Sequence, residues 1–314
     1  MKIEEILDNY LVHIELKELK SHKTALTNVS TLKRHFNGTV LTEFKPGDLL
    51  EFIKSRRNDG RKNNTIRREI GVLRASMNLA VEYGLINEIN GDGHYSKQYL
   101  ASKNIQKWIS NHRPSMGKRD QCPTELELDK IFAELPECVE MIARAAYLTG
   151  WRKSELIHLR FEDVNFEEKE IYLFDHKTRD KTHTLRVTPM YSELYNFMKQ
   201  QKDLAIYKHG DNIEHLHIFR EKNGTEIKIE NTYVRWRNAV KKAGLVDRNG
   251  KYKFNFHDIR RASVRMLFDK LGFDRYMIMD CYTGHSSPHI FEGVYNKKSP
   301  ETYRNVYKKA AMAI

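Results

Sequence analysis

The residues of this chain that are best suited to chemistry are spread over its last two thirds. They are two arginines, two histidines and one tyrosine, in the order Arg152, His257, Arg260, His285 and Tyr295. Guanidinium groups hold phosphate oxygens in a planar fork, and histidines exchange protons near neutral pH. Together with a phenol, these are the groups needed to bind a phosphodiester and attack it with tyrosine oxygen.

The local sequence predicts how these groups are presented. Arg152 follows Gly150 at a turn between two predicted helices, where a guanidinium can reach two phosphate oxygens. His257 and Arg260 are three positions apart in a helix predicted over 257–271, so their side chains share one face. Each residue alone is unremarkable, and only their combination favours a catalytic set.

Residues 1–114 read as an all-helical domain. Apolar residues recur at helical spacing in several stretches, which predict helices over 3–14, 24–36, 42–54, 64–81 and 95–109. Asp48 is predicted as the N-cap of the third helix. A linker is predicted over 115–123, where Pro, Gly and a charge run break the periodicity.

Residues 124–314 read as a second, mixed domain. A capping box at Thr124 opens it, and a later apolar helix is stopped by Gly150. Two strands, 169–177 and 182–189, alternate with period two, and the turn between them places Lys177 at the edge of a hairpin. Further helices are predicted over 191–203, 230–243, 257–271, 274–282 and 299–314. The expected fold is mainly α, with a small antiparallel β-sheet in the second domain.

The charge of the chain favours a polyanionic partner. The net charge is +12 and the isoelectric point is near 9.4. Residues 1–114 carry 19 Lys and Arg against 13 Asp and Glu, and the remainder carries 35 against 29, so each part is +6. Both domains are therefore expected to contact double-stranded DNA.

The basic residues of the first domain are concentrated around the start of its fourth helix. Backbone N–H groups at a helix N-terminus also favour phosphate, so DNA contact is preferred over a merely solvated face. The residues predicted to contact DNA are Arg56, Arg57, Arg61, Lys62, Arg67, Arg68 and Arg74.

Composition argues against several other classes of protein. No apolar run is long enough to span a membrane, and the N-terminus lacks the core of a signal peptide. The three cysteines, Cys122, Cys138 and Cys281, are widely spaced, which favours a reducing cytoplasm over a disulfide framework or a cysteine zinc site. Neither a cofactor nor a metal ion is expected.

In combination, these motifs resemble the tyrosine recombinase, or phage integrase, family. The family's order is an arginine in a Gly-x-Arg-x-x-Glu-Leu setting, a hairpin lysine, His-x-x-Arg, Gly-His and then the nucleophilic tyrosine. The corresponding segments here are 150–156, 176–178, 257–260, 284–287 and Tyr295. The motifs cover 124–314, whereas residues 1–110 resemble the family only as a basic, helical core-binding domain in a compact, Xer-like layout.

The resemblance implies a mechanism without ATP. Tyr295 would form a 3′-phosphotyrosyl bond, Lys177 would protonate the leaving 5′-oxygen, and Glu155 would orient a histidine or arginine of the set. Two positions depart from the pattern. The interval from His285 to Tyr295 is one residue longer than the commonest spacing, which leaves Tyr303 as the alternative nucleophile, and Arg261 stands where a second histidine often follows.

The resemblance also implies an assembly. Residues 299–314 are predicted to form an apolar-faced helix, which would pack either on its own domain or, as the resemblance implies, on a neighbouring protomer of a tetramer on DNA. The tetramer would exchange strands through a Holliday junction. Two alternatives remain open. A type IB topoisomerase shares a similar set of residues and relaxes supercoils as a monomer, and an inactive relative would only bind DNA.

Overall fold

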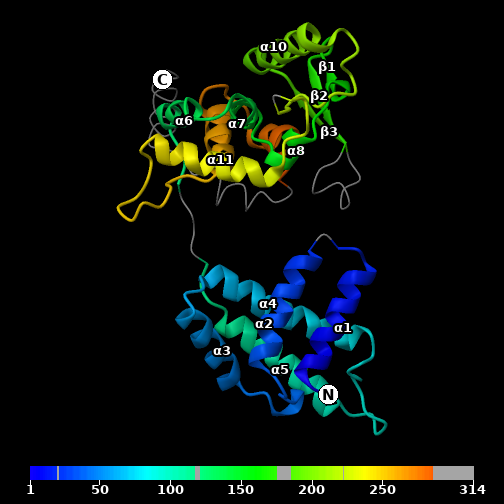
Figure 1. The fold of residues 1–314 in the computed structure, drawn as a ribbon. Coiled ribbons are helices and arrows are strands. Elements are labelled where there is room, and N and C mark those ends of the chain that lie inside the picture. The colour runs from blue at the N-terminus through cyan, green and yellow to red at the C-terminus, as the bar shows by residue number, and fades with distance from the viewer. Residues whose placement is uncertain (20, 117–120, 175–184, 222, 286–314) are drawn as a thin grey trace, which may run out of the picture. The chain divides into compact units, whose positions relative to one another are not determined.

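Apolar residues at helical spacing gather around two separate hydrophobic cores. In the computed structural model, the contacts divide the chain into two units, Met1–Arg119 and Asp120–Ile314 (Figure 1). The structure describes residues 1–19, 21–116, 121–174, 185–221 and 223–285. The expected mainly helical fold with a small antiparallel sheet is confirmed. Within those ranges, none of the helices is both long and apolar enough to cross a bilayer.

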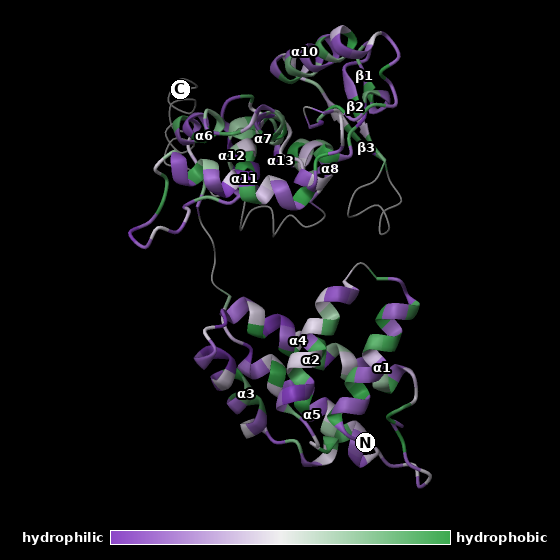
Figure 2. Ribbon diagram, in the orientation of Figure 1, coloured by the Kyte–Doolittle hydropathy of each residue, from purple (hydrophilic) through white to green (hydrophobic). Residues whose placement is uncertain are grey.

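The described part of the first unit is built from helices. Each turns an apolar side toward the core, which Figure 2 shows as hydrophobic and hydrophilic residues on different sides of the ribbons. The α-helices are α1 (Ile3–Leu16), α2 (His22–His35), α3 (Pro46–Asn58), α4 (Asn63–Glu82) and α5 (Lys97–His112).

The start of α3 differs from the prediction. The helix begins at Pro46, and Lys45 rather than Asp48 is its N-cap. Proline suits the first helical position, because it lacks an N–H group and its φ angle is already close to helical. Asp48 lies one turn further on, where its carboxylate accepts the Lys45 backbone N–H at 2.7 Å.

The second unit combines helices with one small sheet. Its α-helices are α6 (Glu125–Phe132), α7 (Glu137–Thr149), α8 (Lys153–Ile157), α10 (Ser192–His209), α11 (Ile229–Lys242), α12 (Ile259–Asp269) and α13 (Arg275–Met277), followed by the π-helical turn η4 (Ile278–Thr283). The predicted capping box of α6 is confirmed, since Thr124 Oγ1 accepts the Glu127 N–H at 3.2 Å.

The sheet contains one more strand than predicted. Its strands β1 (Val164–Asn165), β2 (Glu170–Leu173) and β3 (Arg186–Pro189) are antiparallel in the order β1-β2-β3. A strand of two residues is too short to produce the alternation by which strands are recognised in a sequence, and β1 was missed for that reason. In the register of the hairpin, Leu173 lies opposite Arg186.

A close approach of three segments prepares the site. Gly150 ends α7 in the left-handed conformation, with φ of +68°. A Cβ at Gly150 would lie 3.1 Å from Ser263 Oγ and 3.2 Å from Thr283 Cγ2. The end of α7 therefore packs tightly against both α12 and η4, from segments far apart in the sequence.

Candidate active site

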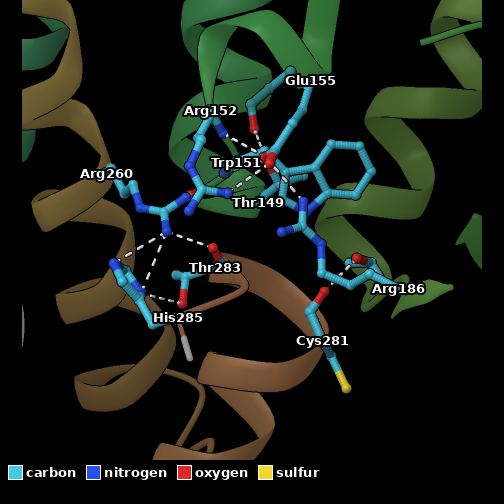
Figure 3. Close-up of polar contacts among 12 residues, drawn as sticks. Thr149, Trp151, Arg152, Glu155, Arg186, Arg260, Cys281, Thr283 and His285 are labelled. Carbon is cyan, nitrogen blue, oxygen red and sulfur yellow. Dashed lines mark hydrogen bonds and ion pairs between the residues drawn. The ribbon is translucent and has the colours of Figure 1, made fainter. Parts of the chain in front are cut away.

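Arg260 connects the segments that carry the predicted site residues. Its side chain is almost fully buried on α12. Nη1 donates to the Gly150 carbonyl at 2.7 Å, and Nη2 donates to the Thr283 carbonyl (Figure 3). One guanidinium thus joins the turn before Arg152 to the turn before His285.

Two arginines and one histidine open onto a common space. A cavity of about 380 Å³ is lined by Arg152, His257 and Arg260, together with residues of α8 and α11. The cavity is large enough for a phosphate group, and two guanidinium groups supply the charge that a phosphodiester requires. The structure brings Arg152 onto the same cavity as His257 and Arg260, from which it lies more than 100 positions away in the sequence.

His285 lies against Arg260 rather than on the cavity lining. Arg260 Nη2 is 3.1 Å from Nε2 and 3.3 Å from Nδ1 of the ring, and Nδ1 lies 2.7 Å from Thr283 Oγ1. Burial, and then the charges of Arg260 and Arg152, lower the pKa of His285 to about 3. The neutral ring has one nitrogen that can accept from Arg260, since a guanidinium only donates.

His257 occupies a different element from the one predicted. It lies in a 3₁₀ turn (Phe256–Asp258), and α12 begins only at Ile259. Part of the residue faces solvent, but the protein around the ring desolvates it, and Arg260 adds an adjacent positive charge. Both effects lower the pKa of His257 to about 4. This imidazole is therefore neutral at physiological pH before a phosphate enters.

Glu155 holds Arg152 in place, as expected for a carboxylate that orients an arginine. Its Oε1 accepts Arg152 Nη1 at 2.7 Å, and Oε2 accepts the Arg152 backbone N–H at 2.8 Å. Burial would raise the pKa of Glu155, but the charges of Arg186 and Arg152 outweigh it and the pKa is lowered. The Glu155 carboxylate therefore stays ionised, and one side of the Arg152 guanidinium stays paired with it.

Arg186 was missed in the sequence. Its Nη2 donates to Glu155 Oε2 at 2.9 Å, and its side chain is only 4% exposed. Strand alternation would place Leu185 and Val187 inside, but Leu185 is 45% exposed and Arg186 is buried. The only feature of the sequence that could have indicated a buried role for Arg186 was a charged residue within a strand that carries no other charge.

Lys153 was also missed, although it directly follows Arg152. It lines the same cavity and is 8% exposed. Its Nζ donates to the Ile229 carbonyl at 2.8 Å and lies 3.1 Å from the centre of the Tyr233 ring. Burial lowers the pKa of Lys153 to about 8. Lys153 therefore joins α8, which forms one part of the cavity wall, to α11, which forms another.

Three predicted residues lie outside the part of the chain that the structure describes. Lys177 falls within 175–184, and both Tyr295 and Tyr303 fall within 286–314. The predicted C-terminal helix over 299–314 lies in the same range. These assignments stay predictions.

The basic residues of the first unit divide into two groups. Arg56 binds the buried Glu69 through two bonds of 3.0 and 2.7 Å, and Arg67 donates to the Pro114 carbonyl at 2.6 Å. These two side chains hold α3, α4 and the segment that follows α5 together. The exposed members, which remain candidates for DNA contact, are Arg57, Arg61, Lys62, Arg68 and Arg74.

Known proteins resemble this chain in sequence. The tyrosine recombinase XerA of Pyrococcus furiosus is 25% identical over 178 residues, which cover 54% of this chain and 59% of that protein. A XerC-like tyrosine recombinase of Caldanaerobacter subterraneus is 23% identical over 269 residues, covering 70% and 67%. The match therefore spans less than two thirds of the XerA relative.

Solved structures show the same fold. A lambda integrase dimer bound to a COC′ core site has a TM-score of 0.70 at 15% identity, covering 95% of this chain and 79% of that one. The Tn1549 transposon integrase in complex with transposon right end DNA also has a TM-score of 0.70, at 16% identity, covering 99% and 100%.

The family assignment follows from the sequence of the second unit. The phage integrase family matches residues 124–302, which include every motif of the predicted site and more than half of the chain. The resemblance drawn from the motifs is thereby confirmed. The chain belongs to the phage integrase family.

Proposed function

We propose that this chain is a site-specific DNA recombinase that cleaves and rejoins DNA strands through a 3′-phosphotyrosyl intermediate. The observation that carries the proposal is the shared cavity of Arg152, His257 and Arg260, with His285 held against Arg260. Two guanidinium groups from distant segments facing one space suit a single phosphate with two non-bridging oxygens. A surface that binds DNA without cleaving it would not need two guanidinium groups that face one cavity.

The proposed reaction is a transfer of one phosphodiester. The Tyr295 oxygen attacks the scissile phosphorus, the bond to the 5′-oxygen breaks, and the phenolic proton passes to a neutral histidine. The 5′-hydroxyl of a partner strand then attacks the phosphotyrosyl bond and releases the phenol. One phosphoester bond is formed and one is broken in each step, so no external energy source is required.

The arginines and histidines act on the phosphate itself. Arg152 and Arg260 neutralise the charge that grows on the non-bridging oxygens through the planar fork of each guanidinium. The low pKa of His257 keeps it neutral and able to accept a proton until a phosphate raises that pKa. Charge neutralisation of this kind is the role that a metal ion has in many nucleases.

Lys177 is proposed as the acid that protonates the leaving 5′-oxygen. Lys177→Ala should slow cleavage of ordinary DNA by about 10²-fold or more, since the leaving alkoxide needs a proton. A substrate with a 5′-bridging sulfur should restore the rate, because a thiolate leaves without one. The measurement is single-turnover cleavage of both substrates. A defect that sulfur does not relieve would remove Lys177 from this role.

Double-stranded DNA is the proposed partner of both units, bound by a tetramer. A lambda integrase tetramer of the same fold has been solved on a Holliday junction, with a TM-score of 0.68 and 16% identity. Exchange of the C-terminal helix over 299–314 between protomers would join the four subunits. The net charge of +12 favours such a complex.

The exposed basic residues of the first unit provide a test of that partner. Replacing Arg57, Arg61 and Arg68 with alanine together should weaken DNA binding and reduce the slope of log affinity against log salt by about 0.9 for each phosphate that is no longer neutralised. The measurement is a titration at several salt concentrations. An unchanged slope would mean that this face does not contact phosphate.

Arg56→Ala is the contrasting variant, because Arg56 is paired with Glu69. Its removal leaves a buried carboxylate without its main partner, which should cost about 3 kcal/mol of unfolding free energy. The salt slope of a folded Arg56→Ala protein should match that of the wild type.

A nicked suicide substrate tests the function as a whole. The wild-type chain should form a covalent adduct at one position within a defined site and should join two such sites. Relaxation of supercoiled DNA of arbitrary sequence, without joining of sites, would favour a topoisomerase instead. DNA binding without any adduct would leave only a binding protein.

A further inference from the structure

We infer that Arg186 is a positioning residue of the cleavage reaction, which sets the orientation of Arg152 and the course of the chain into His285. The inference rests on the proposed function. Arg186 lies on β3, on the strand that leaves the hairpin, and does not line the cavity where the phosphate would bind. Its effect on the reaction must therefore pass through its neighbours.

The first of these neighbours is Glu155. Its two carboxylate oxygens are shared between two arginines: Oε2 accepts Arg186 Nη2 at 2.9 Å, and Oε1 accepts Arg152 Nη1 at 2.7 Å (Figure 3). Without Arg186, Glu155 would pair with Arg152 alone and could follow it toward an incoming phosphate. With Arg186 in place, the carboxylate is tied to the sheet, and Arg152 is held at the cavity wall.

The second neighbour is the turn that carries His285. A Cβ at Gly284 would lie 2.2 Å from Arg186 Nη1 and 3.3 Å from its Cζ, so the guanidinium rests directly on this backbone. Gly284 also has a φ angle of +59°, in the left-handed region. The Arg186 guanidinium and the backbone that leads into His285 therefore fix each other's positions.

The burial of Arg186 is not explained by stability. Its side chain is 4% exposed, and among the described residues its Nε and Nη1 have no hydrogen-bond partner. Burial of a charge that is only partly paired is costly, and an apolar side chain of similar volume would serve packing at least as well. A buried charge that lowers stability and lies beside a reaction centre indicates a role in the reaction.

The charge of Arg186 also reaches His285. The ring is made harder to protonate by burial, and then by the charges of Arg260, Arg152, His257 and Arg186. Removal of the Arg186 charge should raise the pKa of His285. An NMR titration of the His285 ring follows this pKa directly, because the higher pKa of His257, about 4, governs the acid limb of the rate first.

The test is single-turnover cleavage of the suicide substrate at saturating DNA, measured across pH for the full chain. Arg186→Met should slow cleavage by about 10²-fold, because a misplaced Arg152 loses alignment with the phosphorus. DNA affinity should stay close to that of the wild type, and the pKa of His285 should move upward in the NMR titration. Arg186→Lys should restore this pKa but only part of the rate, since lysine retains the charge and loses the fork.

Arg235→Met is the matched control. Arg235 lies on α11 and pairs with Glu221 at 2.6 Å, and neither residue lines the proposed phosphate cavity. An equal loss of rate in both methionine variants, with no shift of the His285 pKa, would overturn the inference in favour of general destabilisation. A rate within about twofold of the wild type for Arg186→Met would overturn it as well.

Gly284→Ala gives an independent approach should Arg186→Met fail to fold. The added methyl group must displace the Arg186 guanidinium while its charge is retained, so a similar loss of rate is expected. A rate within about twofold of the wild type in a folded Gly284→Ala protein would contradict the inference. Failure of the proposed function is a different result, because the wild-type chain itself would then form no adduct.

Discussion

Tyr295→Phe is expected to abolish the covalent adduct between protein and DNA. Phenylalanine keeps the ring and loses the hydroxyl oxygen that we propose attacks phosphorus, so no intermediate should form. Loss of a nucleophile in a covalent mechanism lowers the rate by about four orders of magnitude or more. The measurement is a denaturing gel of wild type and variant after incubation with the nicked suicide substrate.

Binding of DNA should survive this substitution, because the hydroxyl contributes little to the charge that attracts the phosphates. Tyr303→Phe is the matched control, with the same chemical change eight positions later. Its adduct should form at a rate close to that of the wild type. An adduct that persists in Tyr295→Phe and disappears in Tyr303→Phe would reassign the nucleophile.

Arg260→Ala should lower the cleavage rate by about 10³-fold with DNA still bound, since one donor to the developing charge is worth about 10²–10³. Two further losses add to this one. The Gly150 and Thr283 carbonyls lose their donor, and His285 loses the cation beside it. Quenched single-turnover cleavage and a DNA titration separate the chemical step from binding.

Arg260→Lys should recover little of the rate. A lysine carries the charge on a single nitrogen and lacks the planar fork with which the guanidinium reaches two carbonyls of separate segments. Arg160→Ala is the surface control, because Arg160 is exposed and pairs only with nearby acidic side chains such as Glu162. Cleavage by Arg260→Ala at the rate of Arg160→Ala would remove Arg260 from the phosphate site.

The amino-acid sequence by itself determined the helices, the hairpin strands and the order of the chemical groups. These features depend on residues that are close together in the sequence, so they can be recognised without the tertiary structure. Helical spacing predicted α1 to α5, the capping box predicted the start of α6, and Gly150 predicted the end of α7. The motifs from Gly150 to Tyr295, taken in combination, identified the family.

Local competition explains the errors within single elements. Asp48 and Pro46 both suit a helix start, and the proline prevailed because its fixed φ angle and missing N–H fit the first position. His257 falls in a 3₁₀ turn because the carboxylate of Asp258 accepts the Asn255 N–H at 2.7 Å, which caps the turn before α12 begins.

Only the tertiary structure decided which charges are buried and what they hold. Arg186 reads as a solvated residue of an alternating strand, and Arg56 reads as one more cation for DNA. Their partners, Glu155 and Glu69, lie 31 and 13 positions away, and no periodicity in the sequence pairs them. A buried charge is tolerated only where folding brings its counter-charge within reach, and that distance is a property of the packed chain.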